Sequence, residues 1–366
     1  MKVTTPTVLI TRFSAIGDVA LAIPTVYSYC RSNPHLHFLM VTRKPLQNIF
    51  INSPANLTVI GINTATDYKG LCGMRRLLRE LRKDYNIKGY ADLHDVIRTK
   101  YLRKLTSFRL IPTAHIHKGR FEKRKLTRKH NKKLHRLDNT IDRYCKVFER
   151  MGMIFQPGFD YIFGPDGAPD SACPEIARRG NGDDGLKWIG IAPFARHKGK
   201  IYPPELMEKV LEILSQRPDV RLFLFGGGDR ETEQLGQWAA RFPNTVSLAS
   251  ARLGFAAEMA LMSRLDVMLT MDSANLHLAA ISGPAGIVSV WGATHPYCGF
   301  GGWRDFLHSQ VQADLPCRPC SVFGNKPCRF GDYRCLRAIS PEEIVAKVLT
   351  ATRYIPPKYD EEESNN

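Results

Sequence analysis

The first half of the chain alternates short apolar runs with amphipathic stretches. The apolar runs predict β-strands, which fall at residues 8–13, 36–41, 57–62 and 90–93. Between them, apolar positions recur at helical spacing and predict helices, which fall at about 18–31, 44–51, 71–84 and 137–151. The stretch 71–84 is the clearest, because Leu77, Leu78 and Leu81 share one face and basic residues occupy the other.

The second half repeats this alternation more regularly. Apolar runs predict strands at 188–192, 220–225, 246–248, 267–271 and 287–291. Helical spacing predicts helices at 204–216, 230–241, 255–264 and 274–281, then a last helix at about 341–352 and an acidic tail at 360–363. Strands that alternate with helices are typical of parallel sheets covered by helices, so the sequence predicts an α/β fold.

A stretch rich in Pro, Gly and Asp, at about 156–185, separates the two halves and is typical of an interdomain linker. With 366 residues, the chain is long enough for two hydrophobic cores. We therefore expect an N-terminal domain over 1–160, a linker over 161–185, a C-terminal domain over 186–340, and a final helix and tail over 341–366. Ligands of open α/β sheets bind at the carboxyl ends of the strands, which predicts a cleft between the domains.

The charge of the chain is concentrated in one segment. The 52 Lys and Arg residues exceed the 35 Asp and Glu residues, which gives a formal net charge of +17. Between Arg98 and Arg136 there are fifteen basic residues and one acidic residue, Glu122, so this segment carries +14 of that charge. Such a patch attracts polyanions, and we expect an acidic acceptor molecule or an anionic membrane surface as its partner. A solvated basic loop is the alternative.

Three features predict a cytoplasmic protein. No run approaches 18 uninterrupted apolar residues, so we expect no membrane span. The first residues lead directly into a strand and lack the order of a signal peptide. Nine cysteines are then expected to be mostly reduced thiols.

The first candidate for chemistry is the turn from Arg12 to Asp18, between the first predicted strand and the first helix. Small residues there allow a ligand to approach backbone N–H groups at a helix N-terminus, which favours anions. Asp18 would face the cleft, where a carboxylate can act as general base for an acceptor hydroxyl. An ordinary helix-capping aspartate is the alternative interpretation.

Two loops of the second half are candidates for binding a diphosphate. The loop from Ala192 to Pro203 carries Arg196, His197, Lys198 and Lys200, and a lysine there could neutralise a departing pyrophosphate. The glycine run 226–228 resembles a phosphate loop, but it lacks both the dinucleotide fingerprint and the Walker pattern. Glu231 follows it at a predicted helix start, where it could accept a hydrogen bond from a ribose or a base.

The segment 271–279 is a third candidate, because a strand ends there and a helix begins. Asp272 would cap the helix, and the free N–H groups of Ser273, Ala274 and Asn275 could hold a diphosphate. His277 follows one turn later on the Ser273 face. A packed core histidine is an equally good interpretation of His277.

Four cysteines cluster near the end of the chain, at Cys317, Cys320, Cys328 and Cys335. Thiolates in that number could hold a structural zinc ion. The spacing contains only one C-x2-C pair, so reduced thiols packed in an irregular loop are the alternative and no metal is the preferred interpretation.

Taken together, the motifs resemble those of glycosyltransferase family 9, the ADP-heptose:lipopolysaccharide heptosyltransferases and their relatives. The resemblance spans nearly the whole chain. It rests on five segments, which are Ser14–Asp18, Asp92–His94, Lys200–Pro203, Gly226 and Gly227 with Glu231, and Asp272–His277. The chain departs from the common family pattern at Ala274, Tyr202 and His94, where Gly, Trp and Gln are more frequent.

The resemblance implies a GT-B fold, in which two Rossmann-like domains face a central cleft. It also implies an inverting reaction that needs neither a catalytic metal nor a cofactor. Asp18 matches the general base and Lys200 the lysine near the donor phosphates. The expected donor-binding residues are Ala195, Arg196, Lys200, Gly226, Gly227, Glu231, Asp272, Ser273, Ala274 and His277. The expected acceptor-binding residues are Ser14, Gly17, His94, Arg98, Lys123 and Arg124.

We therefore predict a glycosyltransferase that moves a sugar, heptose from ADP-heptose, to an acidic glycolipid of the lipopolysaccharide-core type. Its partners would be the nucleotide sugar, the glycolipid and the anionic inner leaflet of the membrane, with no specific nucleic acid. The alternatives are a related transferase with another nucleotide sugar, or a basic nucleic-acid-binding protein. The second lacks a recognised binding module. A nicotinamide-dependent oxidoreductase is disfavoured by the missing fingerprint, and a relative that only binds is disfavoured by Asp18.

Overall fold

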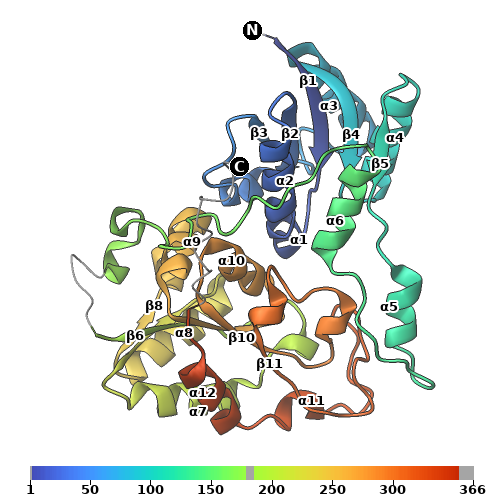
Figure 1. Cartoon of the computed structure of the whole chain (residues 1–366). Coiled ribbons are helices and arrows are strands. Elements are labelled where there is room, and N and C mark those ends of the chain that lie inside the picture. The colour runs from blue at the N-terminus through green and yellow to red at the C-terminus, as the bar shows by residue number, and fades with distance from the viewer. Residues whose placement is uncertain (1, 179–184, 354–366) are drawn as a thin grey trace, which may run out of the picture.

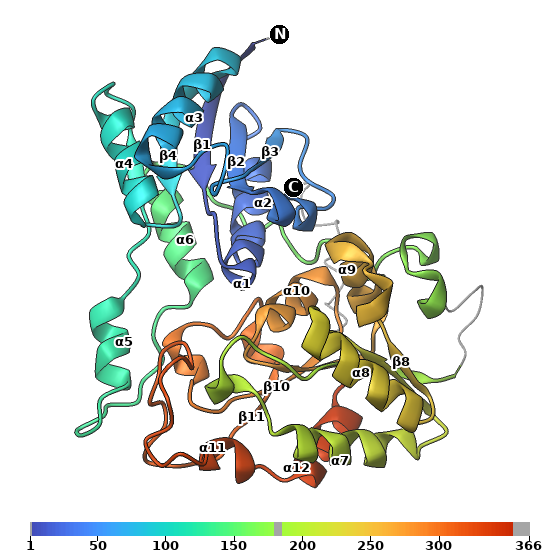
Figure 2. The same cartoon turned by 180° about the vertical axis from the view of Figure 1, so that it is seen from behind.

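The computed structural model describes residues 2–178 and 185–353. Two parallel sheets, each covered by helices, form the two halves of the molecule (Figures 1 and 2). The prediction of an α/β fold is therefore confirmed. In the described part of the chain, no helix combines the length and the apolar character needed to cross a membrane.

The N-terminal sheet has five parallel strands in the order β3-β2-β1-β4-β5. The strands are β1 (Val3–Thr11), β2 (His37–Arg43), β3 (Leu57–Ile62), β4 (Tyr85–Asp92) and β5 (Thr113–His115). The central strands are apolar on both faces, as expected for a parallel sheet covered by helices on both sides. The helices of this half are α1 (Ile16–Ala20), α2 (Ala22–Ser32), α3 (Gly70–Asp84), α4 (Ile97–Ser107), α5 (Arg120–Leu126) and α6 (Thr140–Glu149).

The C-terminal sheet has six parallel strands in the order β11-β10-β9-β6-β7-β8. The strands are β6 (Lys187–Ala192), β7 (Val220–Leu224), β8 (Thr245–Ser247), β9 (Val267–Met271), β10 (Gly286–Val290) and β11 (Ser309–Val311). The helices are α7 (Pro204–Ser215), α8 (Asp229–Arg241), α9 (Gly254–Arg264), α10 (Ala274–Ser282), α11 (Arg334–Arg337) and α12 (Pro341–Thr350). The last helix packs against α7, so the chain returns to the C-terminal sheet at its end.

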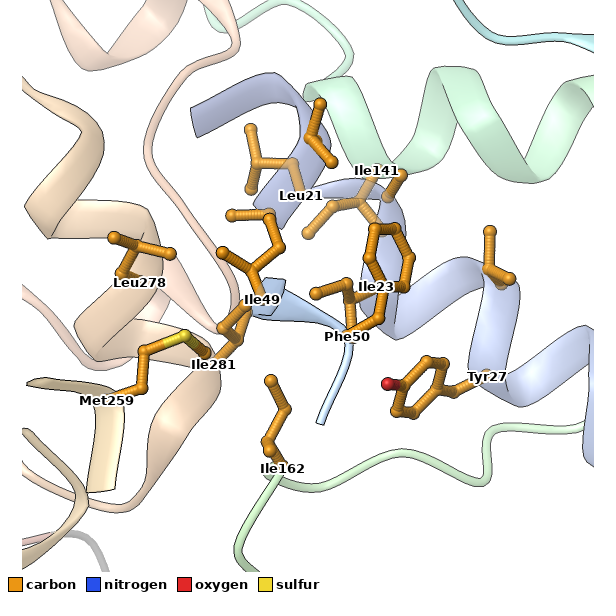
Figure 3. Packing of buried hydrophobic residues seen from close by; sticks show 14 of the residues in the cluster. Leu21, Ile23, Tyr27, Ile49, Phe50, Ile141, Ile162, Met259, Leu278 and Ile281 are labelled. Carbon is orange, nitrogen blue, oxygen red and sulfur yellow. The ribbon is translucent and has the colours of Figure 1, made fainter. Parts of the chain in front are cut away.

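An apolar seam joins the two halves. Figure 3 shows Leu21 and Ile49 of the N-terminal half next to Leu278 and Ile281 of α10, with Phe50 on the other side of Ile49, next to Ile23. All six side chains are at most 9% exposed. Because this seam is continuous with the cores on both sides, the halves form one packed body behind the cleft.

The segment that contains α5 connects the two halves through side-chain contacts. In both views α5 lies beside the loops of the C-terminal half (Figures 1 and 2). After α5, Lys132 Nζ donates to the carbonyl oxygens of Pro316, Cys317 and Pro319, at 3.4, 2.9 and 2.9 Å. Arg136 forms an ion pair of 2.6 Å with Asp305. This part of the basic segment is therefore an ordered strap across the cleft.

The structure differs from the sequence prediction at three places in the first half. The helix predicted at 18–31 is two helices, because Pro24 has no N–H to donate to the Ala20 carbonyl four residues earlier. The segment predicted as a helix at 44–51 is a 3₁₀ helix over Lys44–Ile49. The basic segment contains α4, β5 and α5, which were not predicted because the segment has no strong apolar periodicity. The acidic tail at 360–363 lies outside the described residues.

Candidate active site

Asp18 is the third residue of α1 and lies at the carboxyl end of β1. Its Oδ2 accepts a hydrogen bond of 3.1 Å from the Ala15 N–H, so the carboxylate closes the first turn of the helix. The same oxygen lies 2.6 Å from Nη2 of Arg12, whose Nη1 donates to the Leu93 carbonyl at 2.8 Å. The side chain of Asp18 remains 28% exposed, so it caps the helix and is also accessible from the cleft.

Burial alone would raise the pKa of the Asp18 carboxyl group. The Arg12 guanidinium and the Ala15 N–H outweigh that effect and hold its pKa below the ordinary value. Asp18 is therefore a carboxylate at neutral pH. The same burial lowers the pKa of His94 to about 3, with Arg12 and Lys118 adding to the effect, so His94 is neutral.

Asp92 and His94 support the turn that carries Arg12 and Asp18. Asp92 is fully buried and pairs with Arg103 at 2.7 Å, while its Oδ1 accepts the His94 N–H at 2.9 Å. Nδ1 of His94 accepts from the Phe13 N–H at 3.4 Å, and its Nε2 lies 3.5 Å from the Ser14 hydroxyl. This arrangement fixes the turn that carries Asp18.

On the opposite side, Lys200 and Asp272 form an ion pair of 2.8 Å at the carboxyl edge of the C-terminal sheet. Asp272 is 2% exposed, and its Oδ2 also accepts the Thr294 hydroxyl at 2.7 Å. Tyr202 is buried and donates its hydroxyl proton to the Ile339 carbonyl at 2.8 Å, which anchors the chain just after Lys200. The charge of Lys200 is thus held at the cleft by a buried carboxylate.

Helix α10 begins two residues after Asp272 and packs against α1, and its first N–H groups are the kind that can hold an anion. Ser273, Ala274 and Asn275 are partly exposed there. One turn later, His277 is buried against α1, where a Cβ atom on Gly17 would lie 2.4 Å from its Cδ2. The close approach of the two helices therefore requires glycine at position 17.

His277 lies near charged groups from both halves of the molecule. Burial lowers its pKa to about 4, and the nearby carboxylates of Asp272 and Asp18 only partly oppose this effect. Its Nδ1 is buried and has no hydrogen-bond partner among the described residues. The neutral ring thus lies at the contact of α1 with α10, near both carboxylates.

The other predicted donor-binding residues lie in the segments that follow β6 and β7. Glu231 accepts the Gly227 N–H at 2.9 Å through Oε2 and so closes the glycine turn. A Cβ atom on Gly226 would lie 2.7 Å from Leu235, which explains the glycine there. Ala195 is partly exposed and Arg196 is exposed on the neighbouring loop.

A cavity of about 450 Å³ opens in front of Asp18. It is lined by both halves of the molecule, with the residues Arg12, Asp18, Ile116, Lys118, Arg120, Lys123, Arg124, Thr127, Thr140, Arg143, Phe300, Val322, Phe323 and Lys326. Seven of these side chains are cationic and Asp18 is the single carboxylate, so the cavity suits an anionic ligand.

Lys123 is the most deeply buried lysine of this cavity, at 8% exposure. Its Nζ lies 4.0 Å from the centre of the Phe300 ring, and it has no hydrogen bond or ion pair in the described part of the chain. Burial, with the nearby Arg143 guanidinium, lowers its pKa to about 8. An anion beside Lys123 would compensate its charge.

The structure places the residues of the predicted acceptor set in different surroundings. Lys123 and Arg124 line the cavity, whereas Arg98 lies in the first turn of α4 and does not. Ser14, Gly17 and His94 support the turn of Asp18 without lining the cavity. Sequence reasoning missed Arg12, Arg143 and Phe300 as cavity residues. Arg12 is the first residue of the candidate turn Arg12–Asp18, but sequence reasoning gave it no role of its own.

The four late cysteines lie on one loop and at the start of α11, and all are free thiols. Burial raises the pKa of Cys335 to about 11, with the other three sulfurs near enough to contribute. Among residues 2–178 and 185–353, no three or more His, Cys, Asp or Glu side chains are grouped as metal ligands.

Comparisons with known proteins agree with this architecture. A family model described as glycosyltransferase family 9 (heptosyltransferase) matches residues 113–331. The matched stretch contains Lys123, Lys200 and the Asp272–His277 segment, whereas Asp18 precedes it. A search of curated proteins finds no match.

Solved structures with the same fold come from bacteria. A glycosyltransferase family 9 protein from Veillonella parvula is 18% identical, with a TM-score of 0.69 over 96% of this chain and 98% of that one. The ADP-heptose lipopolysaccharide heptosyltransferase II of E. coli is 14% identical, with a TM-score of 0.65 over 95% and 98%. The E. coli heptosyltransferase WaaC, solved with ADP-2-deoxy-2-fluoro heptose, is 16% identical, with a TM-score of 0.62 over 92% and 97%. The expected GT-B fold is therefore confirmed.

The contact between Gly17 and His277 makes a stability prediction. Gly17→Ala places a methyl group 2.4 Å from a buried ring, and we expect a loss of about 1–3 kcal/mol in the free energy of unfolding, measured in urea. Gly236→Ala, in the open interior of α8, is the control and should be neutral or stabilising. In the double variant Gly17→Ala/His277→Ala, the two losses should be less than additive. Strict additivity would contradict a direct contact.

Proposed function

The chain belongs to glycosyltransferase family 9 and is a glycosyltransferase, and from this premise we propose that it transfers heptose from ADP-heptose to an acidic, lipid-linked acceptor of the lipopolysaccharide-core type. The observation that carries the proposal is the position of Asp18, which lines a cationic cavity and lies on α1, the helix that packs against α10. The heptosyltransferases with the same fold support the choice of donor.

On the acceptor side, we assign the role of general base to Asp18. The acceptor hydroxyl attacks the anomeric carbon, its proton passes to Asp18, and the bond from that carbon to the diphosphate breaks with inversion. Because Arg12 keeps the pKa of Asp18 low, proton transfer comes late, when the new bond has already acidified the acceptor oxygen. Arg12 thus keeps the base ionised at the expense of its basicity.

On the donor side, we assign the leaving diphosphate to Lys200 and to the first N–H groups of α10. Both are fixed before the reaction, Lys200 by Asp272 and the N–H groups by the helix, so they stabilise developing negative charge without rearranging. Ala195, Arg196, Gly226, Gly227 and Glu231 are proposed to surround the nucleotide. These groups supply the positive field in a mechanism that we propose to be independent of metal.

We assign the acceptor to the cavity in front of Asp18. Its seven cationic side chains favour a saccharide with carboxylate or phosphate groups, and Phe300 and Phe323 offer apolar contact. The acceptor would be anchored in the anionic inner leaflet of the membrane, with the protein attached peripherally on the cytoplasmic side. Specific nucleic-acid binding is not part of the proposal.

Replacement of Asp18 tests the proposal most directly. We expect Asp18→Asn to lower kcat by about 10²–10⁴-fold, because the base is lost, and to leave ADP affinity nearly unchanged. Transfer from ADP-heptose to a lipopolysaccharide-core acceptor is the assay, with other nucleotide sugars in parallel. Asp142→Asn is a matched control, since Asp142 accepts the Asn139 N–H with the same 3.1 Å capping bond. Near-normal kcat in Asp18→Asn would remove Asp18 from the base role, and transfer only from another nucleotide sugar would overturn the donor assignment.

Lys200 is expected to act on the donor alone. We predict that Lys200→Ala weakens ADP binding and slows transfer by about 10–10³-fold, because fixed positive charge is lost at the leaving group. Isothermal titration with ADP and initial rates measure both effects. Lys198→Ala, at an exposed position in the same turn, should change neither, and Lys200→Arg should restore part of the binding. Equal losses in the Lys198 and Lys200 variants would argue for a nonspecific charge effect.

Lys123 predicts a pH dependence of acceptor use. Its pKa of about 8 means that it is charged below that pH and loses its charge as the pH rises through it. We therefore expect kcat/KM for the acceptor to fall above about pH 8, with no such fall in ADP affinity. In Lys123→Arg this fall should disappear, while Lys125→Arg, on the exposed face of α5, should retain it. An unchanged profile in Lys123→Arg would assign the titration to another group.

A further inference from the structure

The basic segment 98–136 has an inner and an outer side. Lys118 and Lys123 line the cavity, and Lys132 donates to carbonyl groups of the C-terminal half. By contrast, Lys104 and Lys125 are exposed and form no ion pair in the described part of the chain. Sequence alone does not separate the two groups, and the outer one is left without a role by the proposed reaction.

The outward face of α4 combines apolar and basic side chains in one line. Ile97, Lys100, Lys104 and Phe108 follow each other at helical spacing, so they share one face of the helix. Ile97 is 75% exposed and Phe108 is 74% exposed, at the two ends of this line. The Lys104 ammonium lies 5.8 Å from the centre of the Phe108 ring. A helix face of this kind is typical of the interface between lipid headgroups and acyl chains.

The turn after α4 adds a third exposed apolar side chain. Leu110 is 92% exposed and holds a left-handed backbone conformation, with φ of 57°. A non-glycine residue in this conformation is uncommon, and an exposed leucine gains nothing from solvent. Both features present Leu110 outward at the tip of the turn.

Helix α5 repeats the pattern next to the acceptor cavity. Phe121 is 64% exposed, and the Lys125 ammonium lies 4.5 Å from the centre of its ring. Lys123 and Thr127, on another face of the same helix, line the cavity. Figures 1 and 2 show α4 and α5 along the same outer edge of the molecule.

From this arrangement we infer that the α4–α5 edge docks on an anionic lipid leaflet. Phe108, Leu110 and Phe121 enter the interface, and the neighbouring Lys104 and Lys125 meet headgroup phosphates. The inference rests on the proposed function in one respect, which is that the acceptor is linked to lipid. Helix α5 then lies between the leaflet and the cavity, so an acceptor saccharide reaches Asp18 while its lipid stays in the membrane.

The aliphatic side chains decide between lipid and RNA as the partner of this edge. A single-stranded nucleic acid is held by cations and by aromatic faces on which bases stack. Ile97 and Leu110 offer no such face, and both are more exposed than Phe121. Insertion into a lipid interface uses aliphatic and aromatic side chains alike.

The test is co-sedimentation of the full chain with vesicles of phosphatidylcholine, with and without phosphatidylglycerol, at low salt. We expect binding only to the anionic vesicles. Phe108→Ser/Leu110→Ser and Lys104→Glu/Lys125→Glu should each weaken partitioning by about tenfold or more. Phe306→Ser is the matched apolar control, because Phe306 is also 74% exposed but lies in the C-terminal half. Lys209→Glu, at an exposed position of α7, is the charge control. Neither control variant should change partitioning.

Thermal unfolding and ADP titration of every variant establish that the fold is intact. Unchanged vesicle binding in both double variants would overturn the inference. Binding of the same variants to single-stranded RNA is measured in parallel. If Phe108→Ser/Leu110→Ser loses RNA binding but keeps vesicle binding, the edge would be assigned to RNA instead. Vesicle binding requires no turnover, so a vesicle-bound but inactive enzyme would overturn the proposed function alone. Conversely, transfer to a soluble acceptor fragment without vesicle binding would overturn this inference alone.

Discussion

The contact between α1 and α10 determines where the charged groups of the site lie. The ring of His277 occupies the space that a side chain at position 17 would need, so the first turn of α1 meets α10 directly. Asp18, Asp272 and Lys200 are all near enough to act on the charge of this histidine. Each carboxylate is paired with a cation of its own, Asp18 with Arg12 and Asp272 with Lys200. The proposed base and the proposed site for the leaving group thus each keep a counter-charge of their own.

The basic segment 98–136 serves this arrangement in more than one way. Lys118 and Lys123 line the cavity, whereas Lys132 and Arg136 reach the C-terminal half, where carbonyl oxygens accept hydrogen bonds from Lys132 and Asp305 pairs with Arg136. Its exposed members stay in solvent beside apolar side chains. One stretch of similar composition therefore contains residues with different surroundings, and those surroundings determine the chemistry available to each lysine.

The alternation of apolar runs was sufficient to predict the two sheets, because parallel strands buried on both faces are nearly continuous in hydrophobicity. The motifs at strand ends led to Asp18, Lys200 and Asp272, because the carboxyl ends of parallel strands are where open α/β sheets bind their ligands. Helices α4 and α5 escaped prediction because their outward faces carry Ile97, Phe108 and Phe121, which blur the helical period. The contributions of Arg143 and Phe300 depend on a contact between distant segments, and local sequence patterns carry no record of it.

The apolar seam of Leu21, Ile49, Phe50, Leu278 and Ile281 has a consequence for protein engineering. Two-domain transferases invite modular recombination, in which the donor half of one enzyme is grafted onto the acceptor half of another. In this chain the border between the halves is a shared core, and a graft that ignores it would bury mismatched surfaces. A functional chimera must therefore inherit α10 together with the residues of α1, α2 and the 44–50 segment that pack against it.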